Sequence, residues 1–433
     1  MLAQGNSAYD YGNNYNYSRT DLGDEDTYET SHDDIATSLY RICNEYFPTD
    51  TGTNPSKLDE GERQTRKAAF ENAWSMIRRW FRKHPDMEDR RKATSYMDQY
   101  SMTPLHLCCK SAGTPYDIIE HLVHANPKTV REQEHQGLLP LHYASAYGLS
   151  LEVMTLLCNE YPEGKLIQDR KGRTALHFTF FRRDQEDNTS DEFEDSIDDE
   201  ELTNDTITQL ADLLGNTGAG SIPDDQGLLP MHYACAYGFP AVLKVLYDHD
   251  NTCIHVQDKN GRFPAHFAMS NAINAATPRV LRFLLQVGGT GIIKTRSTNG
   301  NLPIHLLVST ARNCPDEQDK KRNIIETMKT FLDTKPKIDA EMFGAIQSLP
   351  MWLRDHVVIH PHMQTILNRK AAKPHHCFLL FCDLLCYIFL IIGFEVSTRY
   401  AKRSPEDHPW SIHFLSASTA WFLLRELIQI CGL

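Results

Sequence analysis

The sequence predicts an all-α fold: a solenoid of about six helix-turn-helix repeats with β-turn tips, followed by one or two transmembrane helices. Three observations predict this fold class. Segments 137–148 (GLLPLHYASAYG) and 227–238 (GLLPMHYACAYG) agree at ten of twelve positions. A short pattern that ends in histidine recurs at an interval in the mid-thirties, as in stacked helical repeats. Near the carboxyl end, residues 377–394 form an apolar run with a single charge, Asp383.

Charge is unevenly distributed along the 433 residues, whose formal total is −13. Residues 1–34 contribute −7 and residues 184–205 contribute −12, so the remaining chain sums to +6. We expect the first stretch to be a disordered acidic tail rich in Tyr and Asn, and the second a disordered acidic insertion. This acidity disfavours nucleic-acid binding. The eleven cysteines form no C-x-x-C pair, which favours reduced thiols over a structural zinc site.

The recurring pattern is a quartet, seen as TPLH, LPLH, TALH, LPMH, FPAH and LPIH. Proline at the second place suits the first turn of a helix, where no N–H is needed. Thr103 and Thr174 precede two of these helices and suit the capping position. The histidines that close the quartets are separated by 36, 35, 55, 34 and 39 residues. They are His106, His142, His177, His232, His266 and His305.

Each quartet follows a turn and precedes a second apolar run. The turns, such as DRKG at 169–172 and DDQG at 224–227, have an acid or serine first and glycine fourth, as type I turns prefer. The second runs, such as Val153/Leu156/Leu157, have helical spacing. One turn and two short helices cannot bury their apolar face alone. Neighbouring units are therefore expected to stack into one continuous core.

These units resemble ankyrin repeats over roughly residues 98–335, about half of the chain. The resemblance implies that the six histidines are structural, bonding the backbone of their own and adjacent turns, and that they bind no metal. It also implies that the concave surface and the turn tips bind a protein partner, since polar and varied tips suit recognition. The tip residues expected to contact the partner are Glu134, His135, Gln136, Asp169, Arg170, Lys171, Asp224, Asp225, Gln226, Asp258, Lys259, Asn260, Ser297, Thr298 and Asn299.

Two features depart from the ankyrin pattern. Four quartets lack the capping threonine, and each such helix forgoes a cap worth about 1 kcal/mol. The residues in its place are Leu139, Leu229, Phe263 and Leu302. The interval of 55 residues places the acidic insertion 184–205 between the helices of the third repeat, whose second helix is expected to resume at 206–214.

Residues 35–97 are expected to form an amino-terminal helical cap. Within it, segment 67–85 places Phe70, Trp74, Ile77 and Phe81 on one helical face. Basic residues, Arg78 among them, lie close by. Two interpretations stay open: the helix covers the open face of the first repeat, or it binds a membrane surface or a calmodulin-type partner.

Residues 336–374 are expected to form a linker helix, and residues 375–433 to hold the membrane segments. The run 377–394 shows no polar stripe, which favours a membrane span over a buried soluble helix. A charge is costly in lipid, so Asp383 is expected to face a protein partner or water within the membrane. A second run, 409–433, either spans the bilayer or lies at its interface.

The order of repeats, linker helix and apolar helices resembles ankyrin-bearing cation channels of the transient receptor potential type, as does segment 422–430. The chain departs from those channels because it stops where later helices and the pore would begin. Two functions stay open. The first is a membrane-tethered scaffold that contacts the lipid bilayer, presents its repeats to the cytoplasm and binds a protein partner. The second is the amino-terminal part of a truncated channel of this type, which would form a homo-oligomer.

An enzyme is the least favoured class. The sequence contains no glycine-rich phosphate loop and no nucleophile elbow. We therefore expect a non-catalytic protein without cofactor or metal.

Overall fold

The computed structural model of the chain describes residues 32–46, 60–111, 113–180, 197–270, 276–338 and 340–371, together with 383–385, 387–388, 391–392 and residue 395. Every regular element within these residues is a helix and none is a strand, which confirms the all-α prediction for this part of the chain. The chain divides into two compact units, Met1–Arg354 (unit 1) and Asp355–Leu433 (unit 2).

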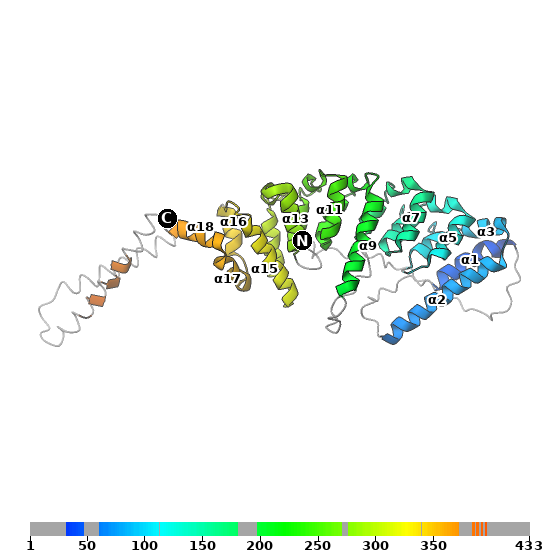
Figure 1. Ribbon diagram of the computed structural model, residues 1–433, viewed down its shortest axis with the longest axis horizontal. Helices are drawn as coiled ribbons and strands as arrows, with labels where there is room; N and C mark the ends of the chain where they lie inside the picture. Colours follow the sequence, from blue (N-terminus) through cyan, green and yellow to red (C-terminus); the bar gives the residue numbers. More distant parts are fainter. Residues whose placement is uncertain are drawn as a thin grey trace. The chain divides into compact units, whose positions relative to one another are not determined.

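Unit 1 repeats a pair of α-helices six times, and Figure 1 shows the pairs following one another along the unit. The first helices are α4 (Pro104–Cys109), α6 (Pro140–Ala146), α8 (Ala175–Phe178), α10 (Pro230–Tyr237), α12 (Pro264–Met269) and α14 (Pro303–Arg312). The second helices are α5 (Tyr116–Ala125), α7 (Leu151–Glu160), α9 (Ile197–Gly215), α11 (Pro240–His249), α13 (Pro278–Gly288) and α15 (Gln318–Asp333). Short 3-10 helices follow five of these: η3 (Pro127–Arg131), η4 (Pro162–Lys165), η5 (Ala219–Ser221), η6 (Cys253–His255) and η7 (Gly289–Lys294).

The two helices of a pair are buried to different extents. Every residue of α4 and of α12 is buried. The second helices instead bury one stripe: in α13, Val280, Leu281 and Leu284 point inward, while Arg279 and Arg282 are exposed. This is the pattern of an inner row of helices covered on one side by an outer, amphipathic row.

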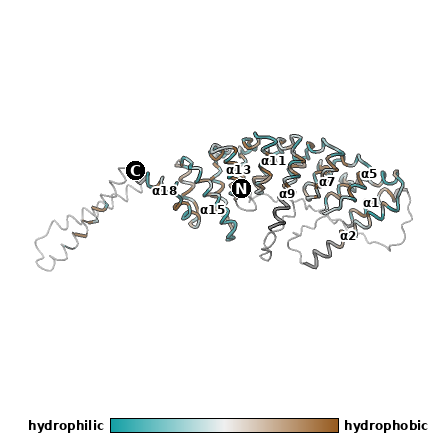
Figure 2. The backbone as a smooth tube through the Cα atoms, in the orientation of Figure 1, coloured by the Kyte–Doolittle hydropathy of each residue, from teal (hydrophilic) through white to brown (hydrophobic). Residues whose placement is uncertain are grey.

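The stack has one continuous core. Each first helix contacts the first helix of the next pair, and each second helix contacts the next second helix. Figure 2 shows hydrophobic stretches along the helices of these pairs. The residue before each repeat histidine is at most 2% exposed, and burying a leucine, isoleucine or methionine side chain contributes roughly 1.5–3 kcal/mol. These residues are Leu105, Leu141, Leu176, Met231, Ala265 and Ile304.

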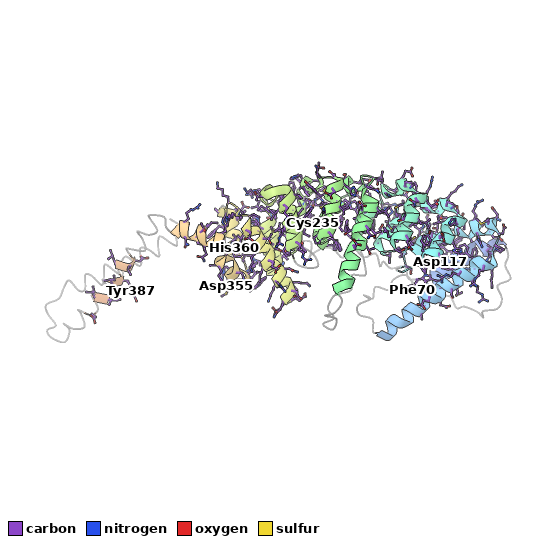
Figure 3. All side chains as sticks on the ribbon, in the orientation of Figure 1. Phe70, Asp117, Cys235, Asp355, His360 and Tyr387 are labelled. Atoms are coloured by element: carbon purple, nitrogen blue, oxygen red, sulfur yellow. The ribbon has the colours of Figure 1, made fainter. Side chains whose placement is uncertain are left out.

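Three helices precede the repeats: α1 (His32–Tyr46), α2 (Glu60–Lys83) and α3 (Met87–Thr94). α1 contacts α4, and both α2 and α3 contact α5. Ile77 and Phe81 are buried. The Arg78 guanidinium donates two hydrogen bonds to the Asp117 carboxylate on α5, at 2.6 and 2.8 Å; Figure 3 labels Asp117. In the described residues these helices cover the first repeat, as the capping interpretation requires.

The acidic insertion differs from its predicted extent. Helix α9 begins at Ile197, so residues 197–205 continue the second helix of the third repeat instead of belonging to a disordered insertion. This stretch contains no glycine or proline, and acidic residues favour the positive amino end of a helix. The remainder of the insertion, 184–196, lies outside the described residues.

The predicted linker helix 336–374 is three helices: α16 (Ala340–Gln347), α17 (Met351–Ile359) and α18 (Pro361–Ala371). Pro361 lacks the N–H that a continuous helix needs and restricts the residue before it, so α17 ends and α18 begins there. Helix α16 contacts α14 as the first helix of a further repeat would. Arg296 also donates to Glu341 Oε2 at 2.8 Å. The stack therefore extends beyond residue 335.

The membrane segments fall mostly on residues that the structure leaves out. Of the run 377–394, residues 383–385, 387–388 and 391–392 are described, and all are helical. The run 409–433 lies outside the described residues. Of the predicted tail 1–34, residues 1–31 also lie outside them, whereas residues 32–34 begin helix α1. Among the helices that are described, none combines the length and apolarity that crossing a bilayer requires.

Candidate functional site

The turns between repeats each begin with a polar residue, and four of these are buried acids. The exposed fractions of Glu134, Asp169, Asp224 and Asp258 lie between 5 and 8%. Each carboxylate accepts hydrogen bonds from the backbone N–H groups of the residues two and four positions later in the chain. Asp169 Oδ1, for example, lies 2.9 Å from the Lys171 nitrogen and 2.7 Å from the Arg173 nitrogen. These four side chains lie inside and hold their own turns, so little of their surface is exposed for the partner contact that the sequence predicts.

The second carboxylate oxygen is bonded within the same repeat. Asp169 Oδ2 accepts from Arg173 Nε at 2.9 Å, and Asp258 Oδ2 accepts from Arg262 Nε at 2.7 Å. In the fourth repeat the Tyr233 hydroxyl donates to Asp224 Oδ2 at 2.7 Å. The guanidinium carbon of each arginine also lies over an aromatic ring, 4.6 Å from the Phe178 centroid for Arg173 and 4.7 Å from the Phe267 centroid for Arg262. Each turn is thus joined to its own first helix.

Glu134 is the longer acid in this series. Burial raises the pKa of its carboxyl, opposed by the bonds from the Gln136 and Leu138 N–H groups. Ser297 begins the last turn; it is half-buried, and its Oγ accepts the Asn301 N–H at 3.2 Å.

The other ten tip residues are exposed and come in five neighbouring pairs. A backbone hydrogen bond links each of the first four pairs to the next turn. In each bond a backbone N–H of the later turn donates to a backbone C=O of the earlier turn, at 2.8–2.9 Å. The donor and acceptor residues are Arg170 and Gln136, Asp225 and Lys171, Lys259 and Gln226, and Thr298 and Asn260. We call this row of five pairs the tip ladder: His135/Gln136, Arg170/Lys171, Asp225/Gln226, Lys259/Asn260 and Thr298/Asn299.

The glycine at the end of each turn allows this ladder to form. Gly172 has φ +75°, and a Cβ there would lie 2.8 Å from Asp225 N of the following turn. Gly261 would meet Thr298 N at the same distance. Gly300 also has positive φ but ends the last described turn of the ladder, and a Cβ there would meet nothing within 4 Å. Glycine is required in the inner turns for close approach as well as for conformation.

All six repeat histidines bond the backbone at the start of their own helix, and four of them also bond the backbone of the next turn. In each histidine, Nδ1 accepts a hydrogen bond from the backbone N–H of the residue just before its own helix. In the second repeat, the Leu139 N–H donates to His142 Nδ1 at 3.0 Å. Nε2 therefore carries the proton, and in His142 it donates to Ile167 C=O of the next turn at 3.2 Å. His106, His177 and His266 donate likewise at 3.1–3.2 Å.

Burial is the first cause of the titration behaviour of these rings. It lowers the pKa of His106, His142, His177 and His232 to about 4. Burial also lowers the pKa of His266. His305, in the sixth repeat, is half-buried and lies 3.9 Å from Glu341.

An aromatic ladder accompanies the histidines, and sequence reasoning missed it. The rings of His106, His142, His177 and His232 meet, edge-on, an aromatic ring of the following repeat, with centroids 5.4–6.1 Å apart. The signal was present: in four of the six quartets the residue after histidine is Tyr or Phe. These partners are Tyr143, Phe178, Tyr233 and Phe267.

Asp383, the predicted intramembrane acid, is helical and half-buried. Most of the run around it lies outside the described residues, so its expected role stays a prediction.

The tip ladder can act as a binding surface. Its ten exposed side chains project from turns that are held at constant register by backbone bonds, so the backbone loses little freedom on contact with a partner. The arrangement suits recognition of an extended polypeptide by side chains of several repeats at once.

The chain is similar to known proteins in three comparisons. A family model described as ankyrin repeats (3 copies) matches residues 105–186. The human transient receptor potential cation channel subfamily A member 1 is 28% identical over 178 residues, 41% of this chain; the match spans 14% of that relative's length. The solved structure of the Bd0816 predatory endopeptidase from Bdellovibrio bacteriovorus in complex with immunity protein Bd3460 matches at 15% identity and a TM-score of 0.37, covering 53% of this chain and 98% of that one. The family model therefore shows ankyrin repeats within residues 105–186, and the same kind of helix pair recurs from α4 to α15.

Proposed function

We propose that this chain is a non-catalytic scaffold that binds a protein partner through the tip ladder and the adjoining concave face. The observation that carries the proposal is the ladder itself, in which backbone bonds between consecutive turns present ten exposed side chains as one edge. Ankyrin repeats generally bind proteins, which supports the assignment.

Charge reversal within the ladder tests this proposal. Arg170 and Lys171 are adjacent and exposed, so Arg170→Glu/Lys171→Glu changes the surface without disturbing the core. Arg279→Glu/Arg282→Glu makes the same change on the outer face of α13 and serves as the matched control. Proteins cross-linked to the full chain in cells would be compared by mass spectrometry. Partners lost in the ladder variant and kept in the control support the proposal; an identical set in all three chains contradicts it.

We further propose that residues 377–394 span a membrane and that the repeats face the cytoplasm. The run has one charge in 18 residues, and five of its described side chains, Leu384, Tyr387, Ile388, Ile391 and Ile392, are 41–58% exposed. Apolar exposure on this scale suits a lipid environment. The full chain should remain in the membrane pellet after carbonate extraction, whereas a chain ending at Arg354 should be released. Release of the full chain contradicts the span.

The second candidate is the amino-terminal part of an ankyrin-bearing cation channel. The match to the human channel favours it. Sequencing the messenger RNA beyond codon 433 separates the candidates: an open frame that encodes further apolar helices supports the channel, and a stop codon there supports the scaffold.

A further inference from the structure

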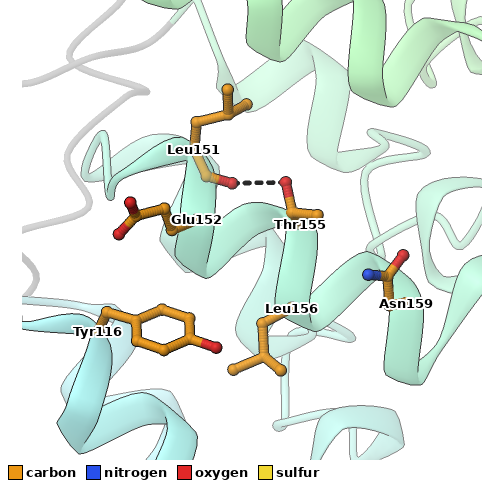
Figure 4. A pocket seen from close by; sticks show the side chains of 6 residues that line it. All are labelled: Tyr116, Leu151, Glu152, Thr155, Leu156 and Asn159. Carbon is orange, nitrogen blue, oxygen red and sulfur yellow. Dashed lines mark hydrogen bonds between the residues drawn. The ribbon is translucent and has the colours of Figure 1, made fainter.

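A groove lies between two neighbouring outer helices, apart from the tip ladder. Its volume is about 600 Å³, and it is lined by Tyr116 of α5 and by Leu151, Glu152, Thr155, Leu156 and Asn159 of α7. Figure 4 shows these side chains, with the Thr155 hydroxyl bonded to the Leu151 carbonyl. Tyr116, Leu151 and Leu156 are half-buried. The groove therefore offers an apolar floor that remains accessible.

The rim of the groove is acidic. Glu152 is exposed on α7, and Glu120 on α5 accepts the Tyr116 hydroxyl at 3.2 Å. These carboxylates contribute to raising the pKa of Tyr116, after the effect of burial. Glu160 adds a second exposed acid at the end of α7, beside the half-buried Glu120.

Acidic residues without basic ones extend over three adjoining outer helices. Helices α5, α7 and α9 contact one another in order, and none of them contains a lysine or an arginine. The next outer helices differ, because α13 carries two arginines and no acid. Of the cations on flanking elements, Arg78 bonds to Asp117, and the Arg131 guanidinium lies 5.0 Å from the Tyr161 ring centroid. Lys128 on η3 is exposed.

We propose that this groove is a second docking site, whose occupant is a basic amphipathic helix of a partner protein. The apolar floor takes one or two large aliphatic side chains from the apolar face of that helix, as in helix-in-groove recognition. The acidic rim pairs with lysines or arginines on either side of this face. Such an arrangement selects against acidic partners by charge repulsion.

A designed peptide tests the proposal. The probe is a fluorescein-labelled 15-residue helix of leucine and lysine, with leucine on one face. Its affinity for the full-length chain in phosphatidylcholine nanodiscs is measured by anisotropy, with empty discs as the reference. We expect Glu152→Gln to weaken binding about threefold, as rim charges do. Leu156→Ala should weaken it about fivefold, because the floor loses its contact.

Two matched controls separate the groove from general effects. Asp248→Asn removes one exposed charge from α11, outside the groove, and Leu166→Ala removes a side chain that is 41% exposed; both should bind as the parent does. The proposal is overturned if both groove variants keep the parent affinity, if Asp248→Asn matches Glu152→Gln, or if a peptide with glutamine in place of lysine binds equally well. Since Glu152 is exposed, its variant remains decisive should Leu156→Ala unfold.

Discussion

The ring of His142 meets the ring of Phe178 edge-on, with centroids 5.5 Å apart and planes at 90°. His142 belongs to the second repeat and Phe178 to the third, so this contact crosses a repeat boundary. The His142 Nε2 bond to Ile167 crosses the same boundary. One side chain thus couples the start of its own helix to the backbone and to an aromatic ring of the next repeat, which is how neighbouring repeats come to unfold together.

We predict that His142→Ala destabilises the chain by about 2–4 kcal/mol, because the Leu139 N–H and the Ile167 carbonyl then lose a buried partner. Urea unfolding followed by circular dichroism measures the loss. His255→Ala removes an exposed histidine and should change stability by less than about 0.5 kcal/mol. Equal effects of the two substitutions would contradict the structural role of the repeat histidine.

Acid should destabilise the stack in a defined pH window. The folded pKa of His106, His142, His177 and His232 is about 4, below the unfolded value of about 6.5. Between these values the unfolded chain binds more protons, so stability is complete above pH of about 6.5 and falls toward pH 4. The loss approaches about 1.4 kcal/mol per pH unit for each histidine.

Urea midpoints at several pH values between 4.5 and 7.5 test this window. His142→Ala removes one of the four groups and should flatten the slope by about one proton. Midpoints that stay constant between pH 6.5 and 4.5 would show that these rings do not titrate on unfolding. Glu134 acts in the opposite direction, since its pKa is raised by burial.

Elements specified by neighbouring residues were predictable from the sequence. The quartets predict the first helices because proline sets φ and needs no N–H, and the acid or serine first and glycine fourth predict the type I turns before them. The groove side of α7 and the position of Phe178 were not predictable, because they depend on the distance between repeats. The burial of Asp169 was missed for a different reason. Its polarity predicts exposure, but its carboxylate accepts hydrogen bonds from the N–H groups of Lys171 and Arg173 inside the turn.

Two glycines with nearly the same φ should respond differently to alanine. Gly300→Ala forces alanine into a left-handed backbone conformation, but its Cβ meets no other atom. This substitution should destabilise the folded chain by about 1–2 kcal/mol. Gly172→Ala carries the same strain and also brings Cβ within 2.8 Å of Asp225 N. It should displace the Lys171–Asp225 backbone bond and cost about 1–2 kcal/mol more. Equal unfolding midpoints for the two variants would contradict the close approach of consecutive turns.

Attachment of the amino-terminal helices should depend on apolar packing more than on the ion pair. Ile77 is fully buried, and Ile77→Ala should destabilise by about 2–4 kcal/mol because it leaves a cavity. The Arg78–Asp117 pair is about 40% exposed, so Arg78→Ala should change stability by about 1 kcal/mol or less. Hydrogen exchange of α1 and α2, measured beside urea unfolding, locates the loss at these helices. A larger effect from Arg78→Ala than from Ile77→Ala would mean that charge pairing holds the amino-terminal helices to the first repeat.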